Sequence, residues 1–132
     1  MKKNFWKDKN IFITGVGGFV GSNLAKNLSK CGANVIGLTK SKKIDSLLYY
    51  ENIDKKINLI FGDITDKELL KSIFLKYKIE ICFHLAAQVD VNVARYNPYE
   101  TFESNSLIDG CMLPLCLDSS FLFISYIIAA LW

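Results

Sequence analysis

The stretch ITGVGGFVGSN, residues 13–23, places four glycines directly after a short apolar run. That run, NIFIT at residues 10–14, is typical of a buried parallel strand. Gly15, Gly18 and Gly21 form the pattern GxxGxxG between this strand and a predicted helix. A glycine turn in this position is where the pyrophosphate of a dinucleotide binds. The stretch therefore predicts a strand, a turn and a helix that together form a nucleotide site.

Each glycine of the pattern has a separate physical role. Gly15 permits a tight turn with a positive φ, Gly18 lets the backbone approach the phosphates, and Gly21 lets helix and strand pack closely. The backbone amides of Phe19 and Val20 are then expected to point at the phosphates. No GK[ST] follows, which excludes a P-loop. A glycine-rich turn without a ligand is the alternative interpretation of the same residues.

The helix after the turn is predicted to extend to about residue 31. Val20, Leu24, Leu28 and Cys31 recur at helical spacing and are expected to form its buried stripe. Gly32 follows as the C-terminal stop.

Strands and helices continue to alternate as far as about residue 105. The later strands are nearly all apolar, and Thr65 with Asp66 is expected to cap the second long helix. This order predicts an α/β fold, a Rossmann-type doubly wound parallel sheet with helices on both faces. The expected strands cover residues 33–38, 57–62 and 80–86, the second long helix covers 65–77, and a short helix lies around Leu47 and Leu48.

Composition excludes several classes of function. The 132-residue chain has a net charge of +3, but its lysines are scattered, so neither nucleic acid nor a membrane is an expected partner. The four cysteines form no CxxC pair and only one histidine accompanies them, which predicts free thiols and no metal site. The first ten residues contain no apolar signal core, so we expect a cytoplasmic protein.

The end of the second predicted strand leaves the choice of dinucleotide open. An acidic residue usually binds the ribose hydroxyls here, but this strand and the TKSKK segment after it contain none. Thr39 and Ser41 can hydrogen-bond a ribose, whereas Lys40, Lys42 or Lys43 can face a 2′-phosphate. A solvated basic loop is the simpler interpretation for at least two of these lysines.

Four motifs in order, FITGVGGFVGSNL, GDITD, FHLAAQ and NPYETFESN, resemble the extended short-chain dehydrogenase/reductase family. This is the group of NAD-dependent sugar-nucleotide epimerases and dehydratases. The run HLAAQVDVNVARYNPYETFESN is most similar to the branch of CDP-glucose and GDP-mannose 4,6-dehydratases. The resemblance covers residues 5–105, favours NAD as cofactor, and implies a sugar-nucleotide substrate.

The resemblance also implies roles for individual residues. Without it, capping a turn explains Asp63 better than ligand contact does. His84, inside an apolar strand, is expected to be a hydrogen-bonded core residue without a catalytic role. The implied pyrophosphate contacts are Gly15, Gly18, Phe19, Val20 and Gly21. The other implied contacts are Asp63 and Ile64 at the adenine edge, Leu85, Ala86, Ala87 and Gln88 at the nicotinamide ribose, and Asn105 in the backbone beside the cofactor.

The catalytic pair that the resemblance implies is absent from this sequence. In these enzymes hydride transfer from sugar C4 needs a tyrosine base in the pattern YxxxK, because a nearby ammonium lowers the phenol pKa from about 10. None of the six tyrosines has a lysine four positions later. We therefore expect an incomplete dehydratase or epimerase whose missing groups come from another chain. The alternatives are a dinucleotide-binding module without catalysis and a non-functional gene fragment.

The resemblance ends after Asn105, which divides the chain into a cofactor-binding domain over 1–105 and an apolar tail over 106–132. Pro114 interrupts the helix that the family has here. A frameshift or premature stop, or a diverged remnant in which FLFIS at 121–125 is a fifth strand, explains the tail. A membrane anchor does not fit, because the final apolar segment of 12 residues is shorter than the roughly 20 that a span needs. The expected sheet is thus truncated at four to five strands, and the homodimer implied by the family has no support in the altered helices.

Overall fold

The structure, a computed structural model, describes residues 3–86 and 122–125. Five strands form one sheet in the order β3-β2-β1-β4-β5, and every neighbouring pair is parallel. Strand order reverses direction between β1 and β4, which makes this the topological switch point of the sheet. The strands are β1 (Asn10–Thr14), β2 (Asn34–Thr39), β3 (Asn58–Phe61), β4 (Ile81–His84) and β5 (Leu122–Ser125).

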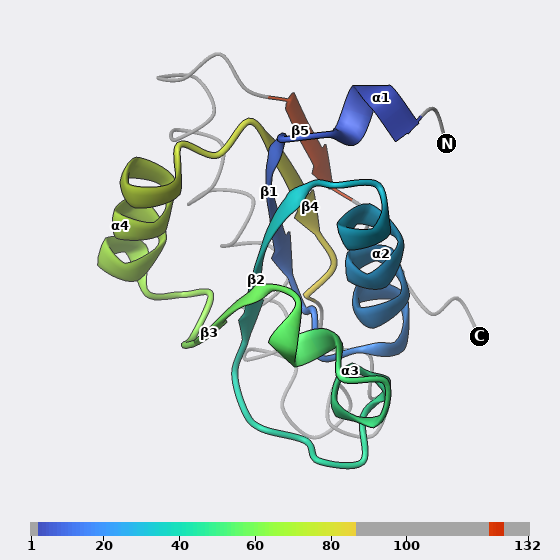
Figure 1. The fold of residues 1–132 in the computed structure, drawn as a ribbon. Helices are drawn as coiled ribbons and strands as arrows, with labels where there is room; N and C mark the ends of the chain where they lie inside the picture. The colour runs from blue at the N-terminus through green and yellow to red at the C-terminus, as the bar shows by residue number, and fades with distance from the viewer. Residues whose placement is uncertain (1–2, 87–121, 126–132) are drawn as a thin grey trace, which may run out of the picture.

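Helices cover both faces of the sheet. Figure 1 shows α4 on one face and α2 with α3 on the other, as a parallel sheet with crossover helices requires. The doubly wound α/β fold predicted from the sequence is thus confirmed. The helices are α1 (Lys3–Trp6), α2 (Phe19–Lys30), α3 (Leu47–Tyr50) and α4 (Lys67–Tyr77), with a 3-10 turn η1 (Ile53–Lys55).

The central strand β1 contributes to the core on both faces. Phe12 packs in the cluster beneath α4, whereas Ile11 and Ile13 pack in the cluster beneath α2 and α3. All three side chains are fully buried. Successive side chains of a strand point to opposite faces, so a continuous apolar run is what a strand covered on both sides needs.

The predicted elements are present, with end points that differ by a few residues. The strand expected at 10–14 has those bounds. The fifth strand that one alternative for the tail placed at 121–125 is observed as β5 over Leu122–Ser125, paired with β4. The stripe predicted for α2 is wrong at Val20, which is 43% exposed. Leu28 is buried as predicted, and the other buried residues of α2 are the small Gly21, Ser22 and Ala25. These small residues allow the helix to approach the glycine turn closely.

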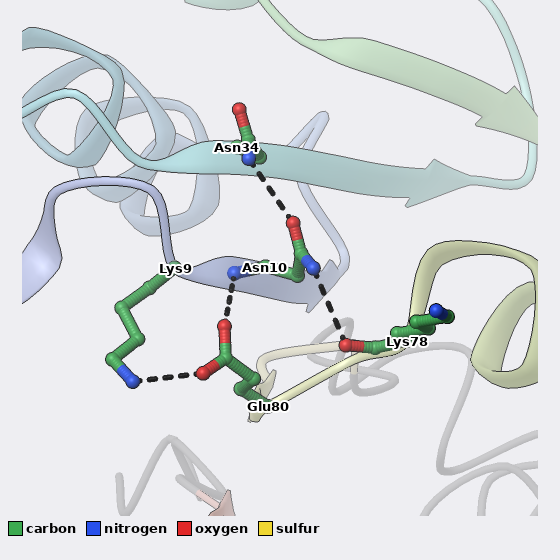
Figure 2. Close-up of polar contacts among 5 residues, drawn as sticks. All are labelled: Lys9, Asn10, Asn34, Lys78 and Glu80. Atoms are coloured by element: carbon green, nitrogen blue, oxygen red, sulfur yellow. Dashed lines mark hydrogen bonds and ion pairs between the residues drawn. The ribbon is translucent and has the colours of Figure 1, made fainter.

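The amino ends of three strands are joined by polar side chains (Figure 2). Glu80 accepts hydrogen bonds from the Lys9 ammonium at 2.8 Å and the Asn10 backbone amide at 2.9 Å. The Asn10 side-chain amide donates to the Lys78 carbonyl at 3.4 Å, and Asn34 donates to the Asn10 side-chain oxygen at 3.1 Å. This network ties β1 to β2 and to the segment that enters β4.

Candidate functional site

The glycine turn joins the carboxyl end of β1 to the start of α2, at the switch point of the sheet. The backbone amides of Gly15 and Val16 donate to the Leu38 carbonyl of β2, at 3.0 and 3.3 Å. Within the turn, the Gly18 amide donates to the Gly15 carbonyl at 3.0 Å. The turn is therefore held by backbone bonds to the neighbouring strand as well as by its own.

Two of the glycines are required by the fold itself. Gly15 has a φ of +69°, and a Cβ there would lie 2.8 Å from the Ala86 backbone nitrogen. A Cβ on Gly21 would overlap the Gly15 carbonyl oxygen and lie 2.8 Å from the Val16 Cα. Real Cβ atoms essentially never approach a neighbour this closely. Tight turn and close helix packing thus explain these two positions without a ligand.

Gly18 differs from both, because the fold does not require a glycine there. Its φ of −78° and ψ of 169° are accessible to any residue. Among the described residues, only the Gly15 carbonyl oxygen, at 3.4 Å, lies within 4 Å of a Cβ built on Gly18. The side of Gly18 where a side chain would project is therefore open in this part of the structure.

Gly17 is a further residue of the glycine turn, and the GxxGxxG pattern assigned it no role. A Cβ on Gly17 would lie 2.9 Å from the Thr39 hydroxyl oxygen, so the turn lies against the end of β2. The signal for it was its place inside the glycine run, outside the GxxGxxG spacing. Thr39 also donates from its hydroxyl to the Ser41 carbonyl at 3.3 Å.

The start of α2 carries no side-chain cap from any residue that the structure describes. By contrast, the start of α4 is capped by Asp66, whose carboxylate accepts a hydrogen bond from the Leu69 amide at 3.0 Å. Phe19 and Val20, in the first turn of α2, are 78% and 43% exposed. An uncapped helix start presents free amides and a positive dipole end, both of which favour an anion.

A buried hydroxyl connects the ends of β1 and β4 beneath the turn. The Thr14 hydroxyl lies 2.6 Å from Nδ1 of His84 and accepts from the backbone amides of Leu85 and Ala86, at 3.2 and 3.3 Å. Thr14 and His84 are 0% and 2% exposed. The expectation that His84 is a hydrogen-bonded core residue is confirmed. Leu85 and Ala86, both partly buried, are held next to Gly15 by these bonds.

A lysine and a carboxylate meet across the ends of β2 and β3. The Lys40 ammonium lies 3.2 Å from one oxygen of Asp63, and these side chains are 75% and 42% exposed. The other oxygen of Asp63 accepts from the Thr65 amide at 2.9 Å and the Thr65 hydroxyl at 2.8 Å. The Thr65 hydrogen bonds, and then Lys40, hold the pKa of Asp63 below its usual value. Asp63 is thus an ionised carboxylate with a partner at each oxygen.

The remaining sequence-predicted site residues are placed differently. Ile64 is partly buried against the cluster beneath α4, so its side chain belongs to the core. Ala87, Gln88 and Asn105 lie outside the described residues.

Residues 3–86 and 122–125 contain no group of three or more side chains that could hold a metal ion. No helix in the same residues has the length and apolar character needed to cross a membrane.

A glycine turn at the switch point of a doubly wound parallel sheet defines a Rossmann-type nucleotide-binding fold. Residues 12–116 match the family described as GDP-mannose 4,6 dehydratase. The chain belongs to this family, and the resemblance to sugar-nucleotide dehydratases and epimerases is confirmed.

Individual relatives agree with this assignment. CDP-glucose 4,6-dehydratase of Salmonella typhimurium is 38% identical over 104 residues, which are 78% of this chain and 29% of the relative. An epimerase from Methanothermobacter thermautotrophicus superposes with a TM-score of 0.79 at 31% identity, covering 93% of this chain and 36% of that one. A UDP-glucose 4-epimerase from Thermotoga maritima, solved with UDP-glucose, superposes with a TM-score of 0.76 at 27% identity, covering 88% of this chain and 37% of that one. The chain thus spans about a third of the length of these relatives.

Proposed function

We propose that this chain binds a nicotinamide dinucleotide, NAD in the first place, through the glycine turn and the start of α2. The observation that carries the proposal is Gly18. A glycine loses more conformational freedom on folding than other residues, and the described fold gives no reason for one at this position. A diphosphate that lies against the backbone does give a reason.

The surroundings of Gly18 fit the same ligand. The first turn of α2 has no side-chain cap among the described residues, and the Gly17 position packs against the end of β2. In a Rossmann-type site the pyrophosphate lies at this helix start and the adenosine extends over the end of the second strand. Asp63, Ile64, Leu85 and Ala86 remain proposed contacts of adenine and nicotinamide ribose, as do Ala87, Gln88 and Asn105.

Calorimetric titration with NAD tests the proposal. We expect the wild-type chain to bind, and Gly18→Asp to abolish binding because its carboxylate occupies and repels the phosphate position. Gly18→Ala is the matched control for the loss of glycine alone. Both variants are expected to unfold thermally within a few degrees of the wild type, because the added atoms meet open space. A folded wild-type chain that binds no NAD, or a Gly18→Asp variant that binds it equally well, would contradict the proposal.

We propose in addition that the chain is the cofactor-binding part of a sugar-nucleotide dehydratase or epimerase. The tyrosine and lysine for hydride transfer must then come from outside these 132 residues, since no YxxxK occurs in them. Incubation of the chain and NAD with CDP-glucose or UDP-glucose, followed by chromatography, is expected to leave the sugar nucleotide unchanged. Turnover by this chain alone would show that other residues perform the chemistry. The alternative is a dinucleotide-binding module without catalysis. The absence of YxxxK supports this alternative and the proposal equally.

A further inference from the structure

A pocket of about 300 Å³ lies between the last turns of α2 and the end of η1. Its volume is at the lower end of the range of small-molecule sites, which is about 300–1,000 Å³. The pocket is at the other end of α2 from the glycine turn, so it is separate from the proposed dinucleotide site. Three of its five described lining residues are lysines, and none of the five is acidic. The lining residues are Lys26, Ser29, Lys30, Ala33 and Lys56.

The lysines of the pocket come from two separate elements. Lys26 and Lys30 are four residues apart in α2, which brings their side chains to one face of the helix, where like charges repel. Lys56, the residue after η1, brings a third positive charge to the same pocket. Lys26 forms an ion pair with Glu51. Among the described residues, neither Lys30 nor Lys56 has an ion-pair partner, so two positive charges of the pocket are uncompensated there.

Ser29 adds a hydroxyl group to the wall of the pocket. Its oxygen is buried and has no hydrogen-bond partner among the described residues. A serine inside a helix usually points to solvent or bonds to the carbonyl four residues earlier, and a buried hydroxyl without a partner costs free energy. Rotation about one side-chain bond turns a serine hydroxyl between staggered positions. The Ser29 hydroxyl can therefore donate to an acceptor that is held in the pocket.

The position of the pocket at a helix end explains only part of this arrangement. The amides of Cys31 and Gly32 donate to carbonyls of the last turn of α2, at 3.0 to 3.1 Å, so these carbonyls are engaged and do not need a lysine. A lysine in the last turn also complements the negative end of the helix dipole, which accounts for Lys30. The dipole does not account for Lys56 on another element or for the buried hydroxyl of Ser29.

We propose that this pocket is a second anion site, which binds a small phosphate monoester through Lys30, Lys56 and the hydroxyl of Ser29. At neutral pH a phosphate monoester carries nearly two negative charges, which match the two uncompensated ammonium groups. Its oxygens accept hydrogen bonds from ammonium and hydroxyl donors alike. The volume of the pocket leaves room for a small organic group beside the phosphate. The bound ester connects α2 to η1 and stabilises the folded chain by mass action.

Calorimetric titration with glycerol phosphate tests the proposal, with inorganic phosphate and glycerol as comparison ligands at constant ionic strength. We expect glycerol phosphate to bind the wild-type chain with a dissociation constant of about 1 mM or lower. Inorganic phosphate should bind more weakly, because it leaves part of the pocket unfilled, and glycerol should not bind. The midpoint of thermal unfolding should rise with the concentration of glycerol phosphate.

Two variants and a matched control test the residues of the pocket. Lys56→Gln should weaken the binding of glycerol phosphate about threefold to fivefold, the effect of one partly exposed charge pair. Lys55→Gln removes the same charge from the adjacent residue, which does not line the pocket, and should change the affinity less than about twofold. Ser29→Ala should weaken binding about threefold. It should not lower stability, because it removes an unpartnered hydroxyl and alanine favours a helix.

Gly18→Asp separates this pocket from the dinucleotide site, and it should retain the wild-type affinity for glycerol phosphate. A folded wild-type chain that does not bind glycerol phosphate would overturn the inference. So would equal weakening by Lys55→Gln and Lys56→Gln, or loss of binding in Gly18→Asp, which would place the phosphate at the glycine turn. Inorganic phosphate binding as tightly as the ester would overturn the choice of an ester. Circular dichroism of each variant verifies that the fold is retained.

Discussion

The amino and carboxyl ends of the sheet differ in the groups that meet there. At the amino end, side chains of Lys9, Asn10, Asn34 and Glu80 bond to one another and to backbone groups, and they close that end. At the carboxyl end the backbone comes close to itself at Gly15 and Gly21, with few side chains between the segments. The polar network at the amino end stabilises the fold, whereas a ligand can approach the backbone at the carboxyl end.

Substitutions at the two ends of the sheet should therefore affect different properties of the protein. Substitutions at the amino end should change stability by small amounts and leave ligand binding intact. Those at the carboxyl end should separate into positions that the fold requires and positions that only the ligand requires. The predictions below test this division.

The largest effect is expected for Gly21→Ala. Helix propensity alone predicts a gain of about 1 kcal/mol for alanine inside α2. The overlap of its Cβ with the Gly15 carbonyl predicts instead a loss near the upper end of about 1–3 kcal/mol. Urea unfolding measures the difference, with Gly18→Ala as a control expected to stay within about 1 kcal/mol. Equal stabilities for the two variants would contradict the division between fold and ligand positions.

A smaller loss is expected for Thr14→Val. This nearly isosteric change removes the hydroxyl that lies beside Nδ1 of His84 and accepts from the amides of Leu85 and Ala86. Loss of a buried partner costs about 1–3 kcal/mol, and Thr14→Ser should recover most of it. Denaturant unfolding gives the stabilities. We also expect a lower NAD affinity, because the backbone amides of Leu85 and Ala86 lose the hydroxyl that accepts their hydrogen bonds. A stability equal to wild type would show that other groups satisfy these amides.

Asp66→Ala should cost about 1 kcal/mol, the usual contribution of an N-cap. Asp66 accepts a hydrogen bond from the Leu69 amide at the start of α4, whereas α2 has no such cap in the described residues. Asp66→Asn retains a side-chain acceptor and should lose only a few tenths of a kcal/mol of stability. Thermal unfolding checks the series. NAD affinity should not change, and a marked decrease would place the α4 start in the ligand site.

The smallest effect belongs to Glu80→Gln at the amino end, and it should depend on pH. The hydrogen bonds from Lys9 and Asn10 hold the pKa of Glu80 below the usual range of a glutamate. A lowered pKa in the folded state adds stability above the unfolded pKa, and that stability is lost as pH falls through the folded value. The Lys9 and Glu80 side chains are 38% and 42% exposed, so solvent screening limits the effect to under about 1 kcal/mol.

Unfolding of wild type and Glu80→Gln at pH 7 and pH 3 measures this contribution. We expect the variant to be slightly less stable at pH 7 and the difference to shrink at pH 3. A difference of the same size at both values would contradict the assignment to Glu80 ionisation. NAD binding at pH 7 should be identical for the two chains.

Elements formed by local patterns were predictable from the sequence. The apolar run of β1 and its glycine turn predicted the strand with its observed bounds, and Asp66 predicted the start of α4. The orientation of α2 was not predictable from apolar spacing. Close contact of Gly21 with the Gly15 carbonyl rotates small residues toward the sheet, and Val20 consequently lies at the surface.

Side-chain contacts that depend on which strands are neighbours could not be predicted from the sequence patterns. Lys40 and Asp63 are each candidate ligand residues by position, but their ion pair arises only because β2 and β3 are neighbours. The bond between Thr14 and His84 joins residues 70 positions apart through the adjacency of β1 and β4. No periodicity in either segment carries that information.

The same adjacency has a consequence for the chain during its synthesis. β1 and β4 pair at the centre of the sheet, and Thr14 and His84 are 70 residues apart. A ribosome adding about 5–20 residues per second delivers β4 roughly 4–14 seconds after β1. Throughout this interval one side of β1 has unpaired backbone groups, which can pair with a neighbouring nascent chain. The speed of translation between these strands thus sets how long the emerging polypeptide is exposed to aggregation.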